Sequence, residues 1–218
     1  ITEWNSAIFS TLGHYAVTTA DRLDADYRII SQSGWGVCSS WDNDPRRVLP
    51  KYYEQVCGLL SGKTQLESGA GDKNGFTSWQ PDAVLVNLGT NDAFAFQSKA
   101  WVDESTGETF EQKLNPDGSY EAESLARFED AVYNFLVMLR RDNPHAHIVW
   151  LYGMIGRTME AYILDALNRY RVEHCDDKVS YLQLPDLKTE WMGANSHPGV
   201  MSHQAAADVL TDYLREIL

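Results

Sequence analysis

Four short apolar segments, separated by longer segments with helical spacing, constrain the fold of this chain most strongly. They are Tyr27–Ser31, Ala83–Leu88, His147–Tyr152 and Val179–Leu184. Each is a near-continuous run of aliphatic, β-branched and aromatic residues, which is typical of strands buried on both faces. Strands that alternate with helices form parallel βαβ units, so we expect a mostly parallel sheet with helices on both faces.

The segments around these strands predict helices. The clearest is Glu121–Arg141, where apolar residues recur at three- and four-residue spacing. Further helices are expected at Tyr15–Leu23, Pro45–Leu60, Met159–Glu173 and His203–Leu218. Two polar stretches, 61–80 and 94–119, interrupt the alternation and are expected to be surface excursions. Long loops after strands lie at the carboxyl edge of a parallel sheet, where α/β domains bind ligands.

Charge and cysteine content exclude several classes of function. The 218 residues include 31 Asp and Glu against 18 Lys and Arg, a net charge of −13 at pH 7. Because a nucleic-acid partner requires a basic surface, we expect none. No run of about 18 apolar residues occurs, so we expect no membrane insertion. Cys38, Cys57 and Cys175 lack CxxC spacing, so neither a metal nor a cofactor is expected, and pairing of Cys38 with Cys57 stays open.

Three clusters of small or polar residues follow the predicted strands or precede the last helix. Gly34, in the loop Ser-Gly-Trp-Gly, offers a backbone N–H, and Asn91, in Gly-Thr-Asn-Asp, offers a side-chain amide. His197, in Ser-His-Pro-Gly, offers an imidazole. Each cluster alone is typical of an ordinary loop. Together they supply oxyanion donors and a general base, the parts of an acyl-transfer site without its nucleophile.

In this order the clusters resemble the motifs of the SGNH, or GDSL-type, hydrolases. Ser33-Gly34 is similar to the second motif, Gly89–Asp92 to the third and His197 to the last. The Ser-Gly-Trp-Gly loop and the His-Pro pair with a second histidine, His203, look most like carbohydrate esterase family two. The resemblance implies a flavodoxin-like three-layer α/β/α sandwich over residues 1–218, and a β-sandwich domain can precede it in that family.

The resemblance also implies an activity. The chain would be a secreted or cell-surface serine esterase that removes O-acetyl groups from plant cell-wall polysaccharide, as an acetylxylan esterase does. His197 would be the catalytic base, and Gly34 and Asn91 would form the oxyanion hole. Trp35 and Trp191, in or near the edge loops, are expected to contact the acetylated carbohydrate. Two alternatives remain: an SGNH lysophospholipase or thioesterase, and a catalytically inactive carbohydrate-binding module on the same fold.

The chain departs from the family pattern beside the histidine. Ala194 stands three residues before His197, where the family has Asp. The imidazole is therefore expected to be oriented by a backbone carbonyl or by another acid such as Asp186. We favour a Ser–His dyad over a triad.

The second departure concerns the nucleophile, because no Gly-Asp-Ser motif occurs in the chain. Ile1-Thr2 match the residues that commonly follow this motif in the family. We therefore expect the nucleophilic serine immediately before Ile1, on a central strand whose absence would leave buried ladder groups unpaired. A competing hypothesis places the nucleophile at Ser6 or Ser10, although too few residues precede them for a strand and a sharp turn.

Overall fold

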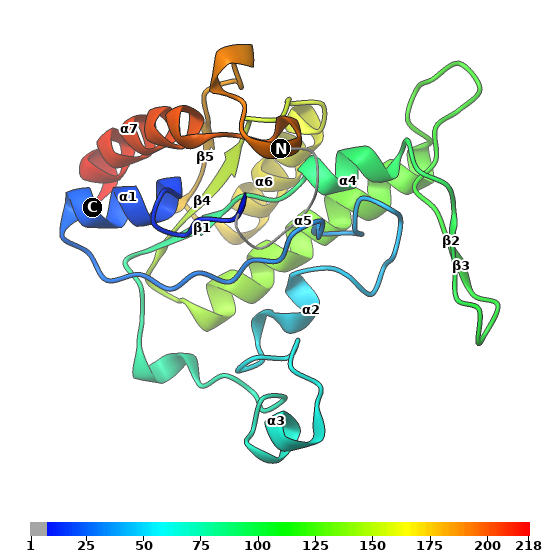
Figure 1. The fold of residues 1–218 in the computed structure, drawn as a ribbon, viewed down its shortest axis with the longest axis horizontal. Coiled ribbons are helices and arrows are strands. Elements are labelled where there is room, and N and C mark those ends of the chain that lie inside the picture. Colours follow the sequence, from blue (N-terminus) through cyan, green and yellow to red (C-terminus); the bar gives the residue numbers. More distant parts are fainter. Residues whose placement is uncertain (1–7) are drawn as a thin grey trace.

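A computed structural model describes residues 8–218 and shows a parallel sheet between two layers of helices (Figure 1). Strands β1 (Ala83–Val86), β4 (His147–Tyr152) and β5 (Val179–Gln183) are adjacent in the order β1-β4-β5. Val86 of β1 lies opposite Trp150 of β4, and both strand pairs are parallel. The structure therefore confirms three of the four predicted strands and the parallel sheet.

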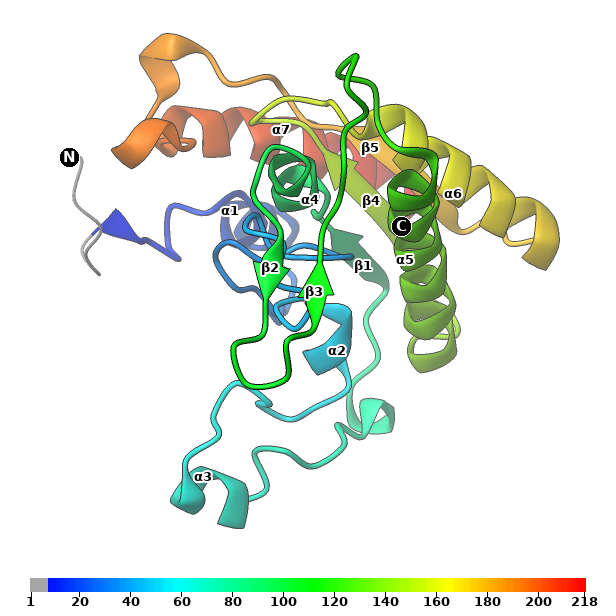
Figure 2. The same cartoon turned by 90° about the vertical axis from the view of Figure 1, so that its right-hand side faces the viewer.

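Helices cover both faces of the sheet, as predicted. Helices α5 (Ala122–Asp142) and α6 (Glu160–His174) lie on one face, and α1 (Tyr15–Leu23) and α7 (Val200–Ile217) lie on the other (Figures 1 and 2). A hydrophobic core lies on each face of the sheet, and strand β4 contributes side chains to both, because successive side chains of a strand point to opposite faces. Ile148, Trp150 and Tyr152 belong to the core under α5 and α6, whereas Val149 and Leu151 belong to the core under α1 and α7.

The helix predictions from apolar spacing are confirmed for four segments. Helix α1 has the predicted bounds, and α5 and α6 differ from theirs by one residue at each end. Helix α7 begins at Val200, three residues earlier than predicted, with Gly199 as its N-cap residue. Its buried residues include Ala206, Leu210 and Leu214, which follow the same four-residue spacing.

The predicted helix Pro45–Leu60 is wrong, because only α2 (Pro50–Tyr53) is helical there. Proline lacks an N–H and is tolerated only in the first turn of a helix, so Pro50 starts a helix and cannot continue one. Before it, the chain is held as a loop, with the Leu49 N–H donated to the Gly36 carbonyl at 3.1 Å.

The predicted buried strand Tyr27–Ser31 is also wrong. The segment is not part of a sheet in residues 8–218, and Tyr27, Ile29 and Ile30 are 47%, 41% and 49% exposed. An extended segment becomes a strand only when a neighbour supplies hydrogen-bond partners. The described part of the chain offers none to this segment.

The two excursions contain short elements of their own. Residues 61–80 include only α3 and one 3-10 turn, and nearly all of them are exposed or half-buried. Residues 94–119 include an antiparallel hairpin, in which residues 101–102 pair with 109–110, and it projects from the body of the molecule (Figures 1 and 2). The remaining elements are α3 (Lys63–Glu67), η2 (Phe76–Ser78), α4 (Thr90–Ala95), β2 (Trp101–Val102), β3 (Thr109–Phe110), η3 (Thr189–Trp191) and η4 (Ala194–Ser196).

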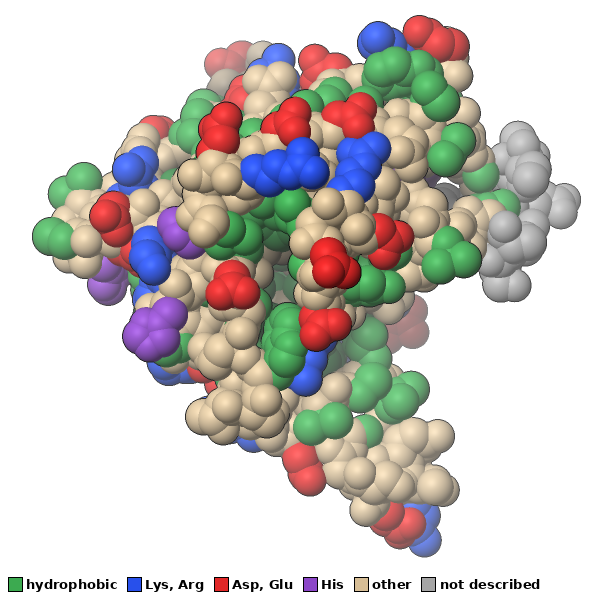
Figure 3. Space-filling model, turned by 90° about the vertical axis from the view of Figure 1, so that its left-hand side faces the viewer, with side chains coloured by type: hydrophobic (Ala, Val, Ile, Leu, Met, Phe, Trp, Pro, Cys, Tyr) green, Lys and Arg blue, Asp and Glu red, His purple; other side chains and the backbone are tan. Residues whose placement is uncertain are grey.

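Charged side chains, apolar helices and cysteines were each considered from the sequence. On the face shown in Figure 3, basic side chains are interspersed with acidic ones and form no continuous basic patch. Within residues 8–218, no helix combines the length and the apolarity needed to cross a bilayer. Cys38, Cys57 and Cys175 are all free thiols in the described structure. Burial raises the pKa of the Cys38 thiol to about 12, which makes it unreactive.

Candidate active site

The carboxyl edge of the sheet gathers the three motif clusters. Helix α4, which carries Asn91, follows β1 after a short connection, and the loop with His197 follows β5. Parallel strands end at the same edge, so both connections leave the sheet on that side (Figure 1). The Gly34 loop is joined to this edge by a hydrogen bond from the Asn91 side chain on α4.

Gly34 has a left-handed backbone conformation. Its φ of +80° lies in the left-handed region that favours glycine. Its carbonyl accepts the Trp41 N–H at 3.1 Å, which closes a loop over residues 34–41. The N–H of Gly34 has no acceptor within residues 8–218. It therefore remains available to a ligand at this edge.

Asn91 contacts the Gly34 loop directly. Its Nδ2 donates to the Trp35 carbonyl at 2.9 Å. An amide nitrogen carries two N–H groups, so one donor of Asn91 remains for a ligand. The hydrogen bond fixes the rotamer of the side chain and brings the backbone of residues 34–35 next to the amide. The structure thus brings together the two predicted oxyanion donors.

His197 has a defined tautomer. Its Nδ1 lies 2.9 Å from the carbonyl oxygen of Asn195. A carbonyl oxygen only accepts, so Nδ1 carries the proton and the lone pair of the neutral ring is on Nε2. In His14 and His203 the reverse holds, because each Nδ1 accepts a backbone N–H, from Ala16 and Tyr15 respectively. His197 therefore has the tautomer of a general base.

The turn before His197 is strained, as is common at functional sites. Asn195 and Ser196 have φ values of +50° and +58°, a conformation that residues other than glycine seldom adopt. This pair of residues turns the Asn195 carbonyl toward the imidazole. Asp186, the alternative acid, instead pairs with Arg157 at 3.4 Å and is exposed. Of the two orienting groups considered from sequence, the geometry supports the backbone carbonyl.

Hydrogen bonds from both sides hold the His197 loop. The His197 carbonyl accepts the Gly193 N–H at 2.7 Å, and the Trp191 carbonyl accepts the Gly199 N–H at 2.8 Å. The hydroxyl of Ser202, in the first turn of α7, also donates to the Trp191 carbonyl, at 3.2 Å. The loop is thus anchored to the start of α7, which fixes the backbone on both sides of His197.

The two tryptophans expected to contact substrate, Trp35 and Trp191, have different neighbours. Trp35 packs against Tyr52, with ring centroids 5.0 Å apart, and Trp191 carries the Lys188 ammonium 3.9 Å above its ring. Both are half-buried. Trp41, which sequence reasoning missed, is 52% exposed, and a Cβ on Gly34 would lie 3.0 Å from its ring. No spacing rule marks Trp41, because the closure of the loop alone brings it beside Gly34.

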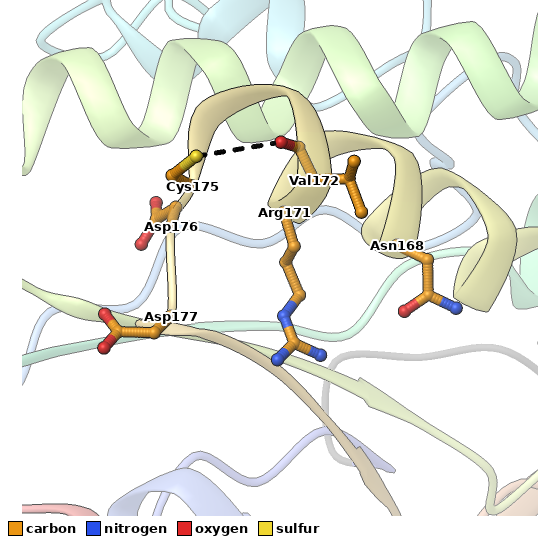
Figure 4. A pocket seen from close by; sticks show the side chains of 6 residues that line it. All are labelled: Asn168, Arg171, Val172, Cys175, Asp176 and Asp177. Carbon is orange, nitrogen blue, oxygen red and sulfur yellow. Dashed lines mark hydrogen bonds between the residues drawn. The ribbon is translucent and has the colours of Figure 1, made fainter.

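A shallow depression at the C-terminal end of α6 is a separate feature (Figure 4). It lies just before β5, at the amino edge of the sheet and away from the motif clusters. The Cys175 thiol there donates a hydrogen bond to the Val172 carbonyl, at 4.0 Å. The depression is lined by Asn168, Arg171, Val172, Cys175, Asp176 and Asp177. Among the described residues, no hydrogen bond joins the Cys175 thiol to either carboxylate.

Two further expectations concern metals and the competing nucleophiles. Within residues 8–218, no three His, Cys, Asp or Glu residues are grouped as a metal site.

The competing nucleophiles are Ser6 and Ser10. Ser6 lies outside the described residues. Ser10 is exposed, and its hydroxyl accepts the Gly13 N–H at 3.4 Å ahead of α1. No described contact links Ser10 to His197.

Comparison with known proteins agrees with the architecture. No protein-family model matches the chain. Among curated proteins, the cellulase/esterase CelE of Acetivibrio thermocellus is 25% identical over 213 residues, which cover 94% of this chain and 21% of that protein. The chain thus spans about a fifth of this relative.

Solved structures extend the likeness to the whole chain. An acetyl xylan esterase (Est2A) from the rumen bacterium Butyrivibrio proteoclasticus superposes with a TM-score of 0.97 at 43% identity, covering 100% of this chain and 58% of that one. A family two carbohydrate esterase from Clostridium thermocellum, solved with cellohexaose, superposes with a TM-score of 0.77 at 21% identity, covering 99% and 57%. These comparisons confirm the resemblance read from the motifs: the chain has the fold of the SGNH-type hydrolases and is most like the family two carbohydrate esterases.

Proposed function

We propose that this chain is the catalytic part of a serine esterase that removes O-acetyl groups from a carbohydrate. The observation that carries the proposal is the 2.9 Å contact between His197 Nδ1 and the Asn195 carbonyl oxygen, from which the proton is assigned to Nδ1. An imidazole held in this way accepts a proton at Nε2, as a general base for a hydroxyl nucleophile does. The pairing with a carbonyl in place of a carboxylate supports a Ser–His dyad.

The reaction follows the two steps of acyl transfer. The serine Oγ attacks the acetyl carbonyl carbon while Nε2 of His197 takes its proton, which leaves a tetrahedral oxyanion. The Gly34 N–H and the second N–H of Asn91 Nδ2 stabilise that oxyanion. The C–O bond to the sugar then breaks, and His197 returns the proton to the sugar oxygen. Water then attacks the acetyl-serine while His197 takes its proton, the C–O bond to the serine Oγ breaks, and His197 returns the proton to Oγ as acetate leaves.

We place the nucleophilic serine immediately before Ile1, at the end of a strand that lies beside β1. Two features of the described residues support this placement. Strand β1 pairs on one side only, with β4, and three of its four residues are half-buried. Tyr27, Ile29 and Ile30 form an extended apolar segment exposed to solvent. A parallel strand between the two would supply hydrogen-bond partners to both and bury the apolar side chains.

Acetylated polysaccharide is the proposed substrate, and a secreted or cell-surface location goes with it. The likeness to an acetyl xylan esterase and to an esterase solved with cellohexaose supports a carbohydrate. The exposed indole of Trp41 beside Gly34 supports it as well, because sugar rings stack on aromatic faces. The hairpin and turn that follow α4 are rich in polar and acidic residues, which favours a small acyl group over a lipid chain.

The test uses the full-length protein and two readouts. A fluorophosphonate probe should label one serine, identified by mass spectrometry as the residue before Ile1. Release of acetate from acetylated xylan should fall at least about 10³-fold in His197→Ala. His145→Ala is the matched control, because His145 lies before β4 at the opposite edge of the sheet, and its activity should stay within about threefold of wild type.

The outcomes separate the alternatives. Labelling at Ser6 or Ser10 would refute the placement of the nucleophile. Hydrolysis of long-chain acyl esters in preference to acetyl esters would indicate the lysophospholipase or thioesterase. Glycan binding without acetate release would indicate an inactive binding module, and full activity in His197→Ala would refute the mechanism.

A further inference from the structure

Asp92 is the neighbour of Asn91 on α4, but its side chain faces the interior. It is 0% exposed, and its carboxylate accepts hydrogen bonds from three successive backbone N–H groups. Val37 donates at 3.2 and 3.0 Å to the two oxygens, and Cys38 and Ser39 donate at 2.7 and 3.1 Å to Oδ1. These N–H groups belong to the loop that begins at Gly34.

The loop is shaped to approach this carboxylate closely. A Cβ on Gly36 would lie 2.3 Å from Asp92 Oδ2 and 2.2 Å from the Ser39 carbonyl oxygen. No residue other than glycine fits there unless the loop moves. The second glycine of Ser-Gly-Trp-Gly is therefore explained by the approach of the backbone to Asp92.

Two adjacent side chains of α4 thus hold the two parts of one loop. Asn91 binds the Trp35 carbonyl at 2.9 Å, and Asp92 binds the N–H groups of residues 37–39. Gly34, the proposed backbone donor, lies just before this clamp. Because the oxyanion donors are the N–H of Gly34 and the amide of Asn91, the clamp controls the distance between them.

We propose that Asp92 is a positioning residue that sets the oxyanion hole through the Gly34 loop. The inference rests on the proposed function and deepens it, since it names the group that aligns the two donors. Asp92 acts only through the backbone and does not touch the substrate. Both carboxylate oxygens accept, because Oδ1 faces all three N–H groups and Oδ2 faces that of Val37. Burial raises the pKa of Asp92, and the three N–H groups oppose that shift because they stabilise the ionised form. An amide in its place would keep one acceptor oxygen but would turn an N–H toward the Val37 N–H.

The transition state should therefore be affected more than ground-state binding. Oxyanion donors act on charge that develops only in the transition state. In Asp92→Asn the displaced loop should lower kcat by about 10²-fold, the size expected for one lost donor, with KM within about threefold. Affinity for the deacetylated oligosaccharide should stay within the same factor.

The experiment compares full-length Asp92→Asn, Gly36→Ala and Asp44→Asn. Gly36→Ala keeps the carboxylate as an acceptor, but its Cβ would lie 2.3 Å from Asp92 Oδ2 and so forces the loop away from Asp92. Asp44→Asn is the control for a buried carboxylate at the same loop, because Asp44 pairs with Arg46 and Arg47 and contacts none of the three N–H groups. Measured quantities are kcat, KM, the melting temperature and hydrogen exchange of the Val37–Ser39 amides.

Each outcome decides the inference. Loss of kcat with faster amide exchange in Asp92→Asn or Gly36→Ala, and kcat kept within threefold in Asp44→Asn, would support it. An active wild type whose Asp92→Asn form keeps kcat, or loses no more kcat than Asp44→Asn, would overturn the inference and leave the proposed function intact. A wild type without esterase activity but with intact fold would overturn both.

Discussion

Replacement of Asn91 by alanine should separate the two roles of its amide. The side chain donates one hydrogen bond to the Trp35 carbonyl at 2.9 Å and offers its second N–H to the proposed oxyanion. Loss of the first is worth about 1 kcal/mol of folding free energy, the net value of a typical intramolecular hydrogen bond. For a domain of this size that lowers the melting temperature by about 2–4 °C.

The catalytic loss should be much larger than the loss of stability. One oxyanion donor is worth about 2.7–4 kcal/mol of transition-state stabilisation, or about 10²–10³ in kcat. We therefore expect Asn91→Ala to fold, to melt a few degrees early and to lose kcat by that factor. Its KM for an acetyl ester should change little, because the donor acts on charge absent from the bound substrate.

Asn87→Ala is a matched control on the same connection between β1 and α4. Asn87 Nδ2 donates to the Tyr15 hydroxyl at 3.0 Å, so this variant also loses one side-chain hydrogen bond. It should show a similar fall in melting temperature with kcat within about threefold of wild type. Steady-state kinetics on a soluble acetyl ester, with thermal unfolding of the same samples, would check both. An Asn91→Ala enzyme that lost less than tenfold in kcat would refute the proposed oxyanion role.

Three further predictions concern the core, the pH dependence and the substrate. Leu210→Ala should lower the free energy of unfolding by about 2–5 kcal/mol in urea titrations, because Leu210 is 0% exposed between α7 and the sheet. Burial, with the nearby His203, lowers the pKa of His14 to about 4 from 6.5, so the unfolded chain binds the proton more tightly and stability should fall as the pH drops from about 6.5 to 4. His14→Asn keeps a helix cap for the Ala16 N–H and should flatten that part of the stability profile; an unchanged profile would contradict the assignment. Trp41→Ala should raise KM several-fold for acetylated xylo-oligosaccharides but not for a small aryl acetate, and equal effects on both would argue against sugar stacking.

Local sequence patterns predicted the elements whose hydrogen-bond partners or apolar pattern lie within their own stretch of sequence. In Glu121–Arg141 the apolar spacing of a buried helix is continuous, and the helix closes its hydrogen bonds within itself, so α5 follows to within one residue. His147–Tyr152 is apolar on both faces, which matches a central strand covered by helices on both sides. The motif residues Asn91 and His197 were likewise placed by the strand ends that precede them.

Segments whose structure depends on hydrogen-bond partners in distant parts of the chain could not be predicted in this way. Tyr27–Ser31 has the composition of a strand but no neighbour within residues 8–218 to pair with. Pro45–Leu60 has helical residues, yet the helix ends after Tyr53, and the N–H groups of Val56 and Cys57 donate to the carbonyls of Asp72 and Ala70 at 2.9 and 2.8 Å. In both cases the sequence window contains no information about the competing hydrogen-bond partners.

Strand and helix patterns in the sequence were enough to predict the fold class, the order of the motifs and the chemical groups that each motif supplies. The contacts between these groups come from the folded chain: Asn91 donates to the Trp35 carbonyl, Asp92 accepts from residues 37–39, Trp41 lies beside Gly34, and the Asn195 carbonyl faces His197. Residues 36 and 92 are far apart along the chain, so no local spacing encodes their contact. The physical reason is that hydrogen bonds and close packing depend on distances in space, which loop closure and the parallel sheet set together.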